Sequence, residues 1–151
     1  MNLLVRGALV ACALLLLARP GLATENMAGH HIVIQVSQSD PDSMNLALNN
    51  MQNAIKYYSG KGEKIAVEIV AYGPGLNMLR EDTSPVKDRI KEMKASNIGP
   101  EIHFSACHNT QMAMEKKEGH PIPIIPVAVV VPAGIVRLTQ LQEQGWSYVR
   151  P

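Results

Sequence analysis

Segments rich in β-branched residues alternate along this chain with segments whose apolar residues recur at helical spacing, and this alternation is the strongest constraint on the fold. Strands are predicted at residues 30–36, 64–72, 101–106, 127–131 and 146–149, with a helical segment between successive strands. Such an order favours parallel strands joined by right-handed crossovers. We therefore expect one domain at residues 30–151, a three-layer α/β/α sandwich around a mostly parallel five-stranded sheet.

Proline, glycine and capping residues mark the ends of the predicted helices. Asp40 followed by Pro41 begins the first helix, and Gly60 ends it. Gly119 ends the helix that follows residue 107. Apolar residues at spacings of three and four predict one buried stripe on the first helix and another on the last. These residues are Met44, Leu48, Met51, Ile55 and Tyr58 in the first, and Ile135, Leu138 and Leu141 in the last.

The fourth predicted strand differs from the others in being apolar throughout. Residues 127–131 read Val-Ala-Val-Val-Val, a pattern typical of a strand buried on both faces. The preceding segment, residues 119–126, is rich in proline and isoleucine. We expect this segment at the opposite end of the sheet from the carboxyl ends of the strands, with its isoleucines exposed as a contact surface.

Residues 1–23 are predicted to form a secretory signal peptide, followed by a flexible leader at residues 24–29. Arg6 precedes an apolar run that is too short to span a membrane, which takes ~20 residues. Small residues just before Thr24 suit a cleavage site. The sequence therefore predicts a periplasmic or secreted protein with no membrane attachment after cleavage.

Charge and cysteine content narrow the function further. The chain has 14 Lys and Arg against 13 Asp and Glu, and two of the basic residues, Arg6 and Arg19, lie in the predicted signal peptide. The nearly neutral remainder has no basic patch, which gives no support to a nucleic-acid partner. Cleavage also removes Cys12, one of two cysteines. An exported chain with Cys107 alone forms no internal disulfide.

Cys107 is the main candidate for chemistry because of its place between a strand and a helix. It follows the apolar residues 101–106 and precedes the helical segment 108–117. A sulfur at a helix N-terminus meets free backbone N–H groups and the positive end of the helix dipole, and both favour the thiolate. His108 is a candidate base for the thiol, with an ordinary surface histidine as the alternative.

Three loops are expected to meet at the carboxyl ends of the predicted strands, where ligands bind in open parallel sheets. They are residues 37–40, residues 73–75 and residues 107–109. The Gly73-Pro74-Gly75 segment lacks the spacing of a nucleotide-binding fingerprint. It predicts a tight turn between a strand and a helix, or else a backbone that closely approaches a neighbouring sulfur.

Two other interpretations of Cys107 remain open. Cys107, His108 and Met112 are soft ligands that could bind a metal such as copper, although they form no regular metal-binding signature. His103 is excluded from that set, because four strand residues put it ~13 Å from Cys107. Alternatively, Cys107 is a buried small side chain in a structural or interaction module. No resident metal or cofactor is predicted, and no hydrolase or oxidoreductase motif is present.

Residues 32–151 resemble the DsrE/DsrF-like sulfur-relay family. The resemblance depends on Tyr72-Gly73-Pro74-Gly75 after the second strand, on the strand-Cys-helix unit that ends in Gly119, and on the closing Leu141-Gln142-Glu143-Gln144-Gly145-Trp146. It implies a doubly wound α/β subunit that assembles into homo-oligomers, either trimers or hexamers. The family's well-known members work in the cytoplasm, whereas this chain has a predicted signal peptide.

The same resemblance implies a cysteine that bears sulfane sulfur as a persulfide and passes it to a partner protein. By position, that cysteine is Cys107. The protein would then be at most a sulfurtransferase-like carrier, whose partners are a sulfur donor and a sulfur acceptor. A thiolate of low pKa that solvent can reach suits such a carrier.

Overall fold

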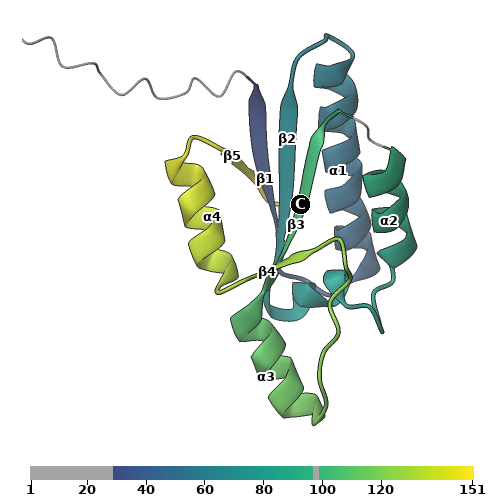
Figure 1. Cartoon of the computed structure of the whole chain (residues 1–151), viewed down its shortest axis with the longest axis vertical. Coiled ribbons are helices and arrows are strands. Elements are labelled where there is room, and N and C mark those ends of the chain that lie inside the picture. Colours follow the sequence, from purple (N-terminus) through teal and green to yellow (C-terminus); the bar gives the residue numbers. More distant parts are fainter. Residues whose placement is uncertain (1–28, 97–98) are drawn as a thin grey trace, which may run out of the picture.

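A five-stranded parallel sheet forms the centre of the computed structural model, which describes residues 29–96 and 99–151 (Figure 1). The strand order is β4-β3-β2-β1-β5, and every neighbouring pair is parallel. The strands are β1 (His30–Val36), β2 (Ile65–Ala71), β3 (Glu101–Cys107), β4 (Val129–Val131) and β5 (Ser147–Val149). The predicted α/β class is confirmed. The predicted signal peptide and all of the leader except residue 29 lie outside the described residues.

Helices connect the strands in the predicted alternation. They are α1 (Pro41–Ser59), the 3₁₀-helix η1 (Gly73–Leu79), α2 (Lys87–Ser96), α3 (His108–Glu118) and α4 (Gly134–Glu143). Asp40 caps α1 as expected, since its Oδ1 accepts a hydrogen bond of 2.8 Å from the Ser43 N–H. No helix in the described part of the chain is long and apolar enough to cross a membrane.

Each face of the sheet has its own hydrophobic core, which gives the predicted three layers. Helices α1 and α2 cover one face, and the larger core lies beneath them. Most of the α1 stripe is buried there, in the form of Met44, Leu48, Met51 and Ile55. Helix α4 covers the other face, where Leu138 and Leu141 pack with Trp146. Ile135, predicted to share the α4 stripe, is instead 61% exposed. Successive steps of three residues fall short of a full helical turn, so Ile135 lies to one side of the face that carries Leu138 and Leu141.

Helix α3 extends away from the carboxyl end of the sheet and does not cover either face (Figure 1). None of its residues is buried. It ends at Gly119, as predicted, and this residue has the positive φ of 76° that favours glycine.

The segment after α3 does not lie where the sequence predicted. It runs back beside η1 at the carboxyl end of the sheet, where the Ile125 N–H donates to the Leu79 carbonyl at 2.9 Å. Ile122 and Ile125 are buried, so the isoleucines do not form the expected contact surface. The predicted position of this segment was wrong because β4 is short and pairs with the last three residues of β3. The chain therefore enters β4 near the carboxyl end of the sheet and need not return to its amino end.

The prediction of a fully buried fourth strand was also wrong. Strand β4 covers three residues and lies at the edge of the sheet, with Val129 and Val130 exposed by 66% and 44%. An edge strand has no neighbour on one side, so an apolar sequence there need not be covered within the same chain.

Candidate functional site at the junction of β3 and α3

Cys107 is the last residue of β3 and the N-cap of α3, which confirms its predicted place between a strand and a helix. Its side chain points to the α4 face of the sheet, on the same side as Ser105 two residues earlier. The residue is 5% exposed, so the sulfur lies close beneath the surface instead of in the open. The residue is therefore less open to solvent than the accessible thiolate expected of a sulfur carrier.

The Cys107 sulfur is surrounded by hydrogen-bond donors. Burial is the largest influence on the thiol and by itself raises the pKa. The hydroxyl of Thr110 and the backbone N–H groups of Gly134, Thr110 and Asn109 donate to the sulfur and together outweigh burial. The net result is a pKa below that of an ordinary thiol, as the helix N-terminus predicted.

Two helices begin at this sulfur. Asn109 and Thr110 belong to the first turn of α3, whereas Gly134 is the first residue of α4. Their N–H groups lack partners within their own helices, because the first turn of a helix leaves its donors without intrahelical acceptors. The Asn109 N–H also donates to the Pro132 carbonyl, at 3.4 Å. The positive ends of both helix dipoles therefore add to the hydrogen bonds in favouring a negative charge on the sulfur.

Gly134 is needed at its position because the Tyr72 side chain packs directly against it. A Cβ on Gly134 would come within 2.9 Å of Cβ and Cδ1 of Tyr72. A larger residue would have to displace either the tyrosine ring or the beginning of α4. Displacement of α4 would move the Gly134 N–H away from the Cys107 sulfur.

Thr110 links the sulfur to the Gly-Pro-Gly turn. The Thr110 Oγ1 accepts a hydrogen bond of 2.9 Å from the Gly73 N–H, and the same hydroxyl donates to Cys107. Gly75 fits against the end of β1, since a Cβ there would lie 2.4 Å from the Val36 carbonyl oxygen. The predicted tight turn is thus confirmed. The close backbone approach is to β1, and the turn reaches the sulfur through Thr110.

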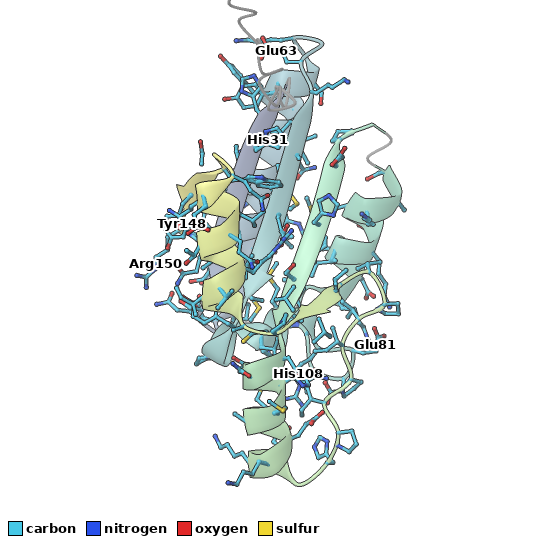
Figure 2. The ribbon with its side chains drawn as sticks, turned by 60° about the vertical axis from the view of Figure 1, so that its left-hand side comes forward. His31, Glu63, Glu81, His108, Tyr148 and Arg150 are labelled. Atoms are coloured by element: carbon cyan, nitrogen blue, oxygen red, sulfur yellow. The ribbon has the colours of Figure 1, made fainter. Side chains whose placement is uncertain are left out.

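Polar side chains from β5 and the residues after it lie near Tyr72. Burial raises the pKa of Tyr72, as do the nearby Tyr148 and Cys107, whereas Arg150 lowers it. The Tyr148 hydroxyl donates to Oε1 of Gln35 on β1. Figure 2 shows Tyr148 and Arg150 side by side beyond α4. The carboxyl ends of β1, β2, β3 and β5 therefore contribute groups to one neighbourhood.

His108 is adjacent to Cys107 in sequence but is exposed, at the end of the sheet opposite His31 and Glu63 (Figure 2). Its Nδ1 lies 3.4 Å from Oε1 of Gln111, one turn further along α3. Across residues 29–96 and 99–151, no hydrogen bond joins the His108 ring to the Cys107 sulfur. The structure thus supplies donors to the thiolate from the backbone and Thr110, and the role of His108 as a base stays a prediction.

The residues of the metal hypothesis do not converge in one pocket. Met112 is 46% exposed on α3, and His108 is also at the surface, whereas Cys107 is nearly buried. Among the described residues, no group of three or more His, Cys, Asp and Glu side chains is arranged to hold a metal ion. His103 is exposed on β3 and lies beside Glu101, at 3.6 Å.

An open depression of about 420 Å³ lies beside the site, between the loops at the carboxyl ends of β1 and β2 and helix α3. Thr110 lines it and is also a hydrogen-bond partner of the Cys107 sulfur. The other lining residues are Ser39, Gly73, Pro74, Asn77, Arg80, Ala113, Met114 and Lys117. Residues from two of the three predicted loops, 37–40 and 73–75, therefore meet here, together with Thr110, which directly follows the third loop.

Sequence reasoning missed three residues that define this site: Thr110, Gly134 and Tyr72. Thr110 lies three positions after Cys107, which precedes the predicted helix. A polar side chain at this spacing can form a hydrogen bond with the residue before the helix. That signal was present in the sequence. Gly134 and Tyr72 reach the sulfur through tertiary packing, which no local pattern indicates.

The chain is similar to a solved structure described as a protein of unknown function, MTH1491 from Methanobacterium thermoautotrophicum, with 28% sequence identity and a TM-score of 0.66. The likeness covers 81% of this chain and 99% of that one. No family model matches the sequence, and no curated protein does. The likeness supports the α/β fold and says nothing about activity.

Proposed function

We propose that this protein is a sulfur carrier of the DsrE/DsrF-like type, which bears sulfane sulfur as a persulfide on Cys107. The observation that carries the proposal is the set of donors around the sulfur, namely the Thr110 hydroxyl and the N–H groups of Asn109, Thr110 and Gly134. A neutral thiol is a weak hydrogen-bond acceptor, so several donors aimed at it would be poorly satisfied. A thiolate or a persulfide anion satisfies them.

The transfer needs no oxidant or reductant. The Cys107 thiolate attacks the outer sulfur of a donor persulfide, R–S–SH, and a new S–S bond forms between Cys107 and that sulfur. The donor's own S–S bond breaks, and its electron pair leaves with the donor thiolate, R–S⁻. The proton stays on the transferred sulfur or passes to water. An acceptor thiolate then repeats the same exchange and regenerates the Cys107 thiolate.

The burial of Cys107 restricts the donor. Because the residue is 5% exposed, a small polysulfide or a flexible persulfide-bearing segment suits the site better than a rigid surface does. The same burial would shield the persulfide from oxidation, which increases with exposure and thiolate character. Such shielding would be useful to a carrier in an oxidising compartment, and we include export to the periplasm or beyond in the proposal.

Mass spectrometry of the intact protein tests the proposal. The full chain with Cys12→Ser is incubated with polysulfide, or with thiosulfate and a sulfurtransferase. Its intact mass is then measured before and after treatment with a thiol reductant. We expect a gain of one sulfur atom that the reductant removes and that Cys107→Ser abolishes. If no sulfur is gained, or if the gain survives Cys107→Ser, the carrier function is wrong.

A second candidate is a structural or interaction module, which the burial of Cys107 favours. In that case the native thiol reacts slowly with small and large reagents alike, and unfolding in urea accelerates both. A carrier instead predicts that a small reagent such as methyl methanethiosulfonate reacts quickly in the native state, while a bulky aromatic disulfide reacts slowly. The ratio of the two native rates separates the candidates.

The exposed apolar residues around β4 support a homo-oligomer, which we propose as a trimer or hexamer. Val129 and Val130 on the edge strand lie close in sequence to Ile135 and Val136, which are exposed by 61% and 49% at the beginning of α4. An exposed edge strand with an apolar sequence pairs readily with another chain. Self-association would cover this surface close to the Cys107 site.

A further inference from the structure

Glu68 is a buried carboxylate in the middle of the central strand β2. Every residue of this strand is buried, and the Glu68 side chain is fully enclosed beneath α4. Removal of a carboxylate from water is costly, and an apolar residue of similar size would often serve stability as well or better. A charge at this position therefore calls for a reason beyond packing.

The carboxylate of Glu68 joins β3 to α4. Its Oε1 accepts a hydrogen bond of 2.6 Å from the Ser105 hydroxyl and one of 2.7 Å from Nε of Arg137. Its Oε2 accepts a hydrogen bond of 2.6 Å from Nη2 of Arg137. The arginine thus binds the carboxylate with two parallel hydrogen bonds, an arrangement that fixes direction as well as distance.

Both partners of Glu68 are close in sequence to the groups that form the thiol site. Ser105 precedes Cys107 by two residues on β3 and faces the same side of the sheet. Arg137 lies in the first turn of α4, three residues after Gly134, and its backbone N–H donates to the Ala133 carbonyl at 3.0 Å. The ion pair therefore connects the strand that holds the sulfur to the helix turn that donates to it.

We propose that Glu68 and Arg137 are positioning residues, which hold the beginning of α4 against β3 so that the Gly134 N–H meets the Cys107 sulfur. This proposal deepens the carrier function and rests on it. It explains why a charged side chain lies in an otherwise apolar strand: the apolar contacts of Leu138 and Leu141 are not directional, whereas two parallel hydrogen bonds fix the position of α4. Neither residue touches the sulfur.

Other titratable groups near the sulfur stay unchanged in a test of Glu68 and Arg137. His108 is next to Cys107 on α3, and Tyr72 packs against Gly134 and lies near the sulfur. Tyr148 and Arg150, from β5 and the following residue, act on Tyr72. None of these four is bonded to Glu68 or Arg137 within the described ranges, so a shift in thiol reactivity would reflect the position of α4.

The test measures the rate of Cys107 alkylation by iodoacetamide against pH in the full chain with Cys12→Ser. Glu68→Gln keeps the shape of the side chain but removes its charge, and Arg137→Met removes the two parallel hydrogen bonds. We expect each variant to move the midpoint of the rate profile to higher pH and to lower the rate at pH 7 about fivefold, the effect of one lost hydrogen bond. The double variant should show no larger shift than either single one, since the two residues act as a unit.

The matched control is Arg89→Met, because Arg89 ties α2 to α1 on the other face of the sheet. Its Nη1 and Nη2 donate to Asn45 at 2.7 Å and to Asn49 at 2.6 Å. This variant should leave the midpoint unchanged. An unchanged midpoint in folded Arg137→Met, or an equal shift in Arg89→Met, overturns the positioning role. If Glu68→Gln does not fold, Arg137→Lys replaces it, because this variant keeps the charge but not both hydrogen bonds. We expect it to move the midpoint to higher pH as well.

This measurement is independent of sulfur transfer. Failure of the wild-type chain to gain sulfur would remove the carrier function and leave the link between Glu68 and thiol ionisation standing. A chain that gains sulfur normally but has the same midpoint in all variants would keep the carrier and remove the positioning role.

Discussion

The Cys107 sulfur combines two properties that usually oppose each other, burial and ease of ionisation. Burial alone makes a thiol inert and raises its pKa, as in most buried cysteines. Here the donors at the start of α3 and α4 reverse that effect. The thiol is therefore ionised more readily than an ordinary cysteine although the residue is buried.

Thr110 is the side chain whose removal tests this balance most simply. Thr110→Val keeps the size of the residue and deletes the hydroxyl that donates to Cys107 and accepts from Gly73. A hydrogen bond to a charged group is worth roughly 1.5 kcal/mol, so we expect the alkylation rate at pH 7 to fall about tenfold. The readout is the rate profile against pH, whose midpoint should rise.

Thr139→Val is the matched control for this change. Thr139 is exposed on α4, and its hydroxyl donates to the Ile135 carbonyl of its own helix at 3.0 Å. It should react like the wild type at every pH. Equal rates for Thr110→Val and the wild type would show that the hydroxyl does not support the thiolate.

The site could be predicted from the sequence only in part. Cys107 was identified because a strand and a helix are recognisable on either side of it, and a helix N-terminus has a known effect on a thiol. Its burial was not predictable, since it depends on Tyr72 and α4, which approach from other parts of the chain. The choice of His108 reflected adjacency in sequence, whereas the structure directs that side chain toward Gln111.

At the scale of elements, Arg80 fixes α3 to the end of η1. Its guanidinium is nearly buried and binds Asp82 at 2.9 and 2.8 Å and Glu118 at 2.6 and 2.8 Å. Glu118 is the last residue of α3, a helix without buried residues of its own. The ion network therefore holds a helix that packing secures poorly.

The same network predicts a dependence of stability on pH. Hydrogen bonds from Arg80 lower the pKa of Asp82 to about 2, against 3.8 for a free carboxyl. A group whose pKa is lower in the folded state stabilises the protein above its unfolded value and loses that effect as the pH falls through the folded value. The contribution of Asp82 is thus complete above pH 3.8 and is lost as the pH approaches about 2.

We expect Asp82→Asn to lower the melting temperature at pH 6 by about 2–4 °C, the usual scale for a single modest loss in a domain of this size. The difference from the wild type should shrink between pH 4 and pH 2, as followed by circular dichroism. Asp88→Asn, in the first turn of α2, is the control, because Asp88 has no ion pair among the described residues. A difference that is constant with pH would contradict the assigned role of Asp82.

The order of the elements was predictable because each depends on local signals. Asp40 and Pro41 begin α1, Gly119 ends α3, and the apolar runs mark the strands. The neighbours of β4 were not predictable, because an apolar run looks the same at the edge of a sheet and in its centre. The predicted path of the segment after α3 was wrong for a related reason, because that path depends on the number of β4 residues that pair with β3.

At the scale of the whole molecule, the exposed edge at β4 predicts self-association. Val129→Lys places a charge on the most exposed apolar residue of that edge. Burial of a lysine at an interface is unfavourable, so we expect the proposed trimer or hexamer to dissociate at micromolar concentration, as measured by light scattering coupled to size exclusion.

Leu46→Lys is the control for the edge, because Leu46 is 46% exposed on α1, away from β4. It should leave the mass of the assembly unchanged. A wild-type chain that is monomeric under the same conditions, or a Leu46→Lys chain that dissociates as readily as Val129→Lys, would contradict assembly through β4.

The most direct test of the whole account is the pKa of the Cys107 thiol in the folded protein. Ultraviolet absorbance of the thiolate is followed through a pH titration of the full chain with Cys12→Ser, and the signal of the same chain with Cys107→Ser is subtracted. We expect a midpoint below that of the same thiol in the chain unfolded in urea, because the donors around the sulfur lower the pKa of Cys107 in the folded protein. A native midpoint at or above the urea value would show that the donors around the sulfur do not stabilise a thiolate.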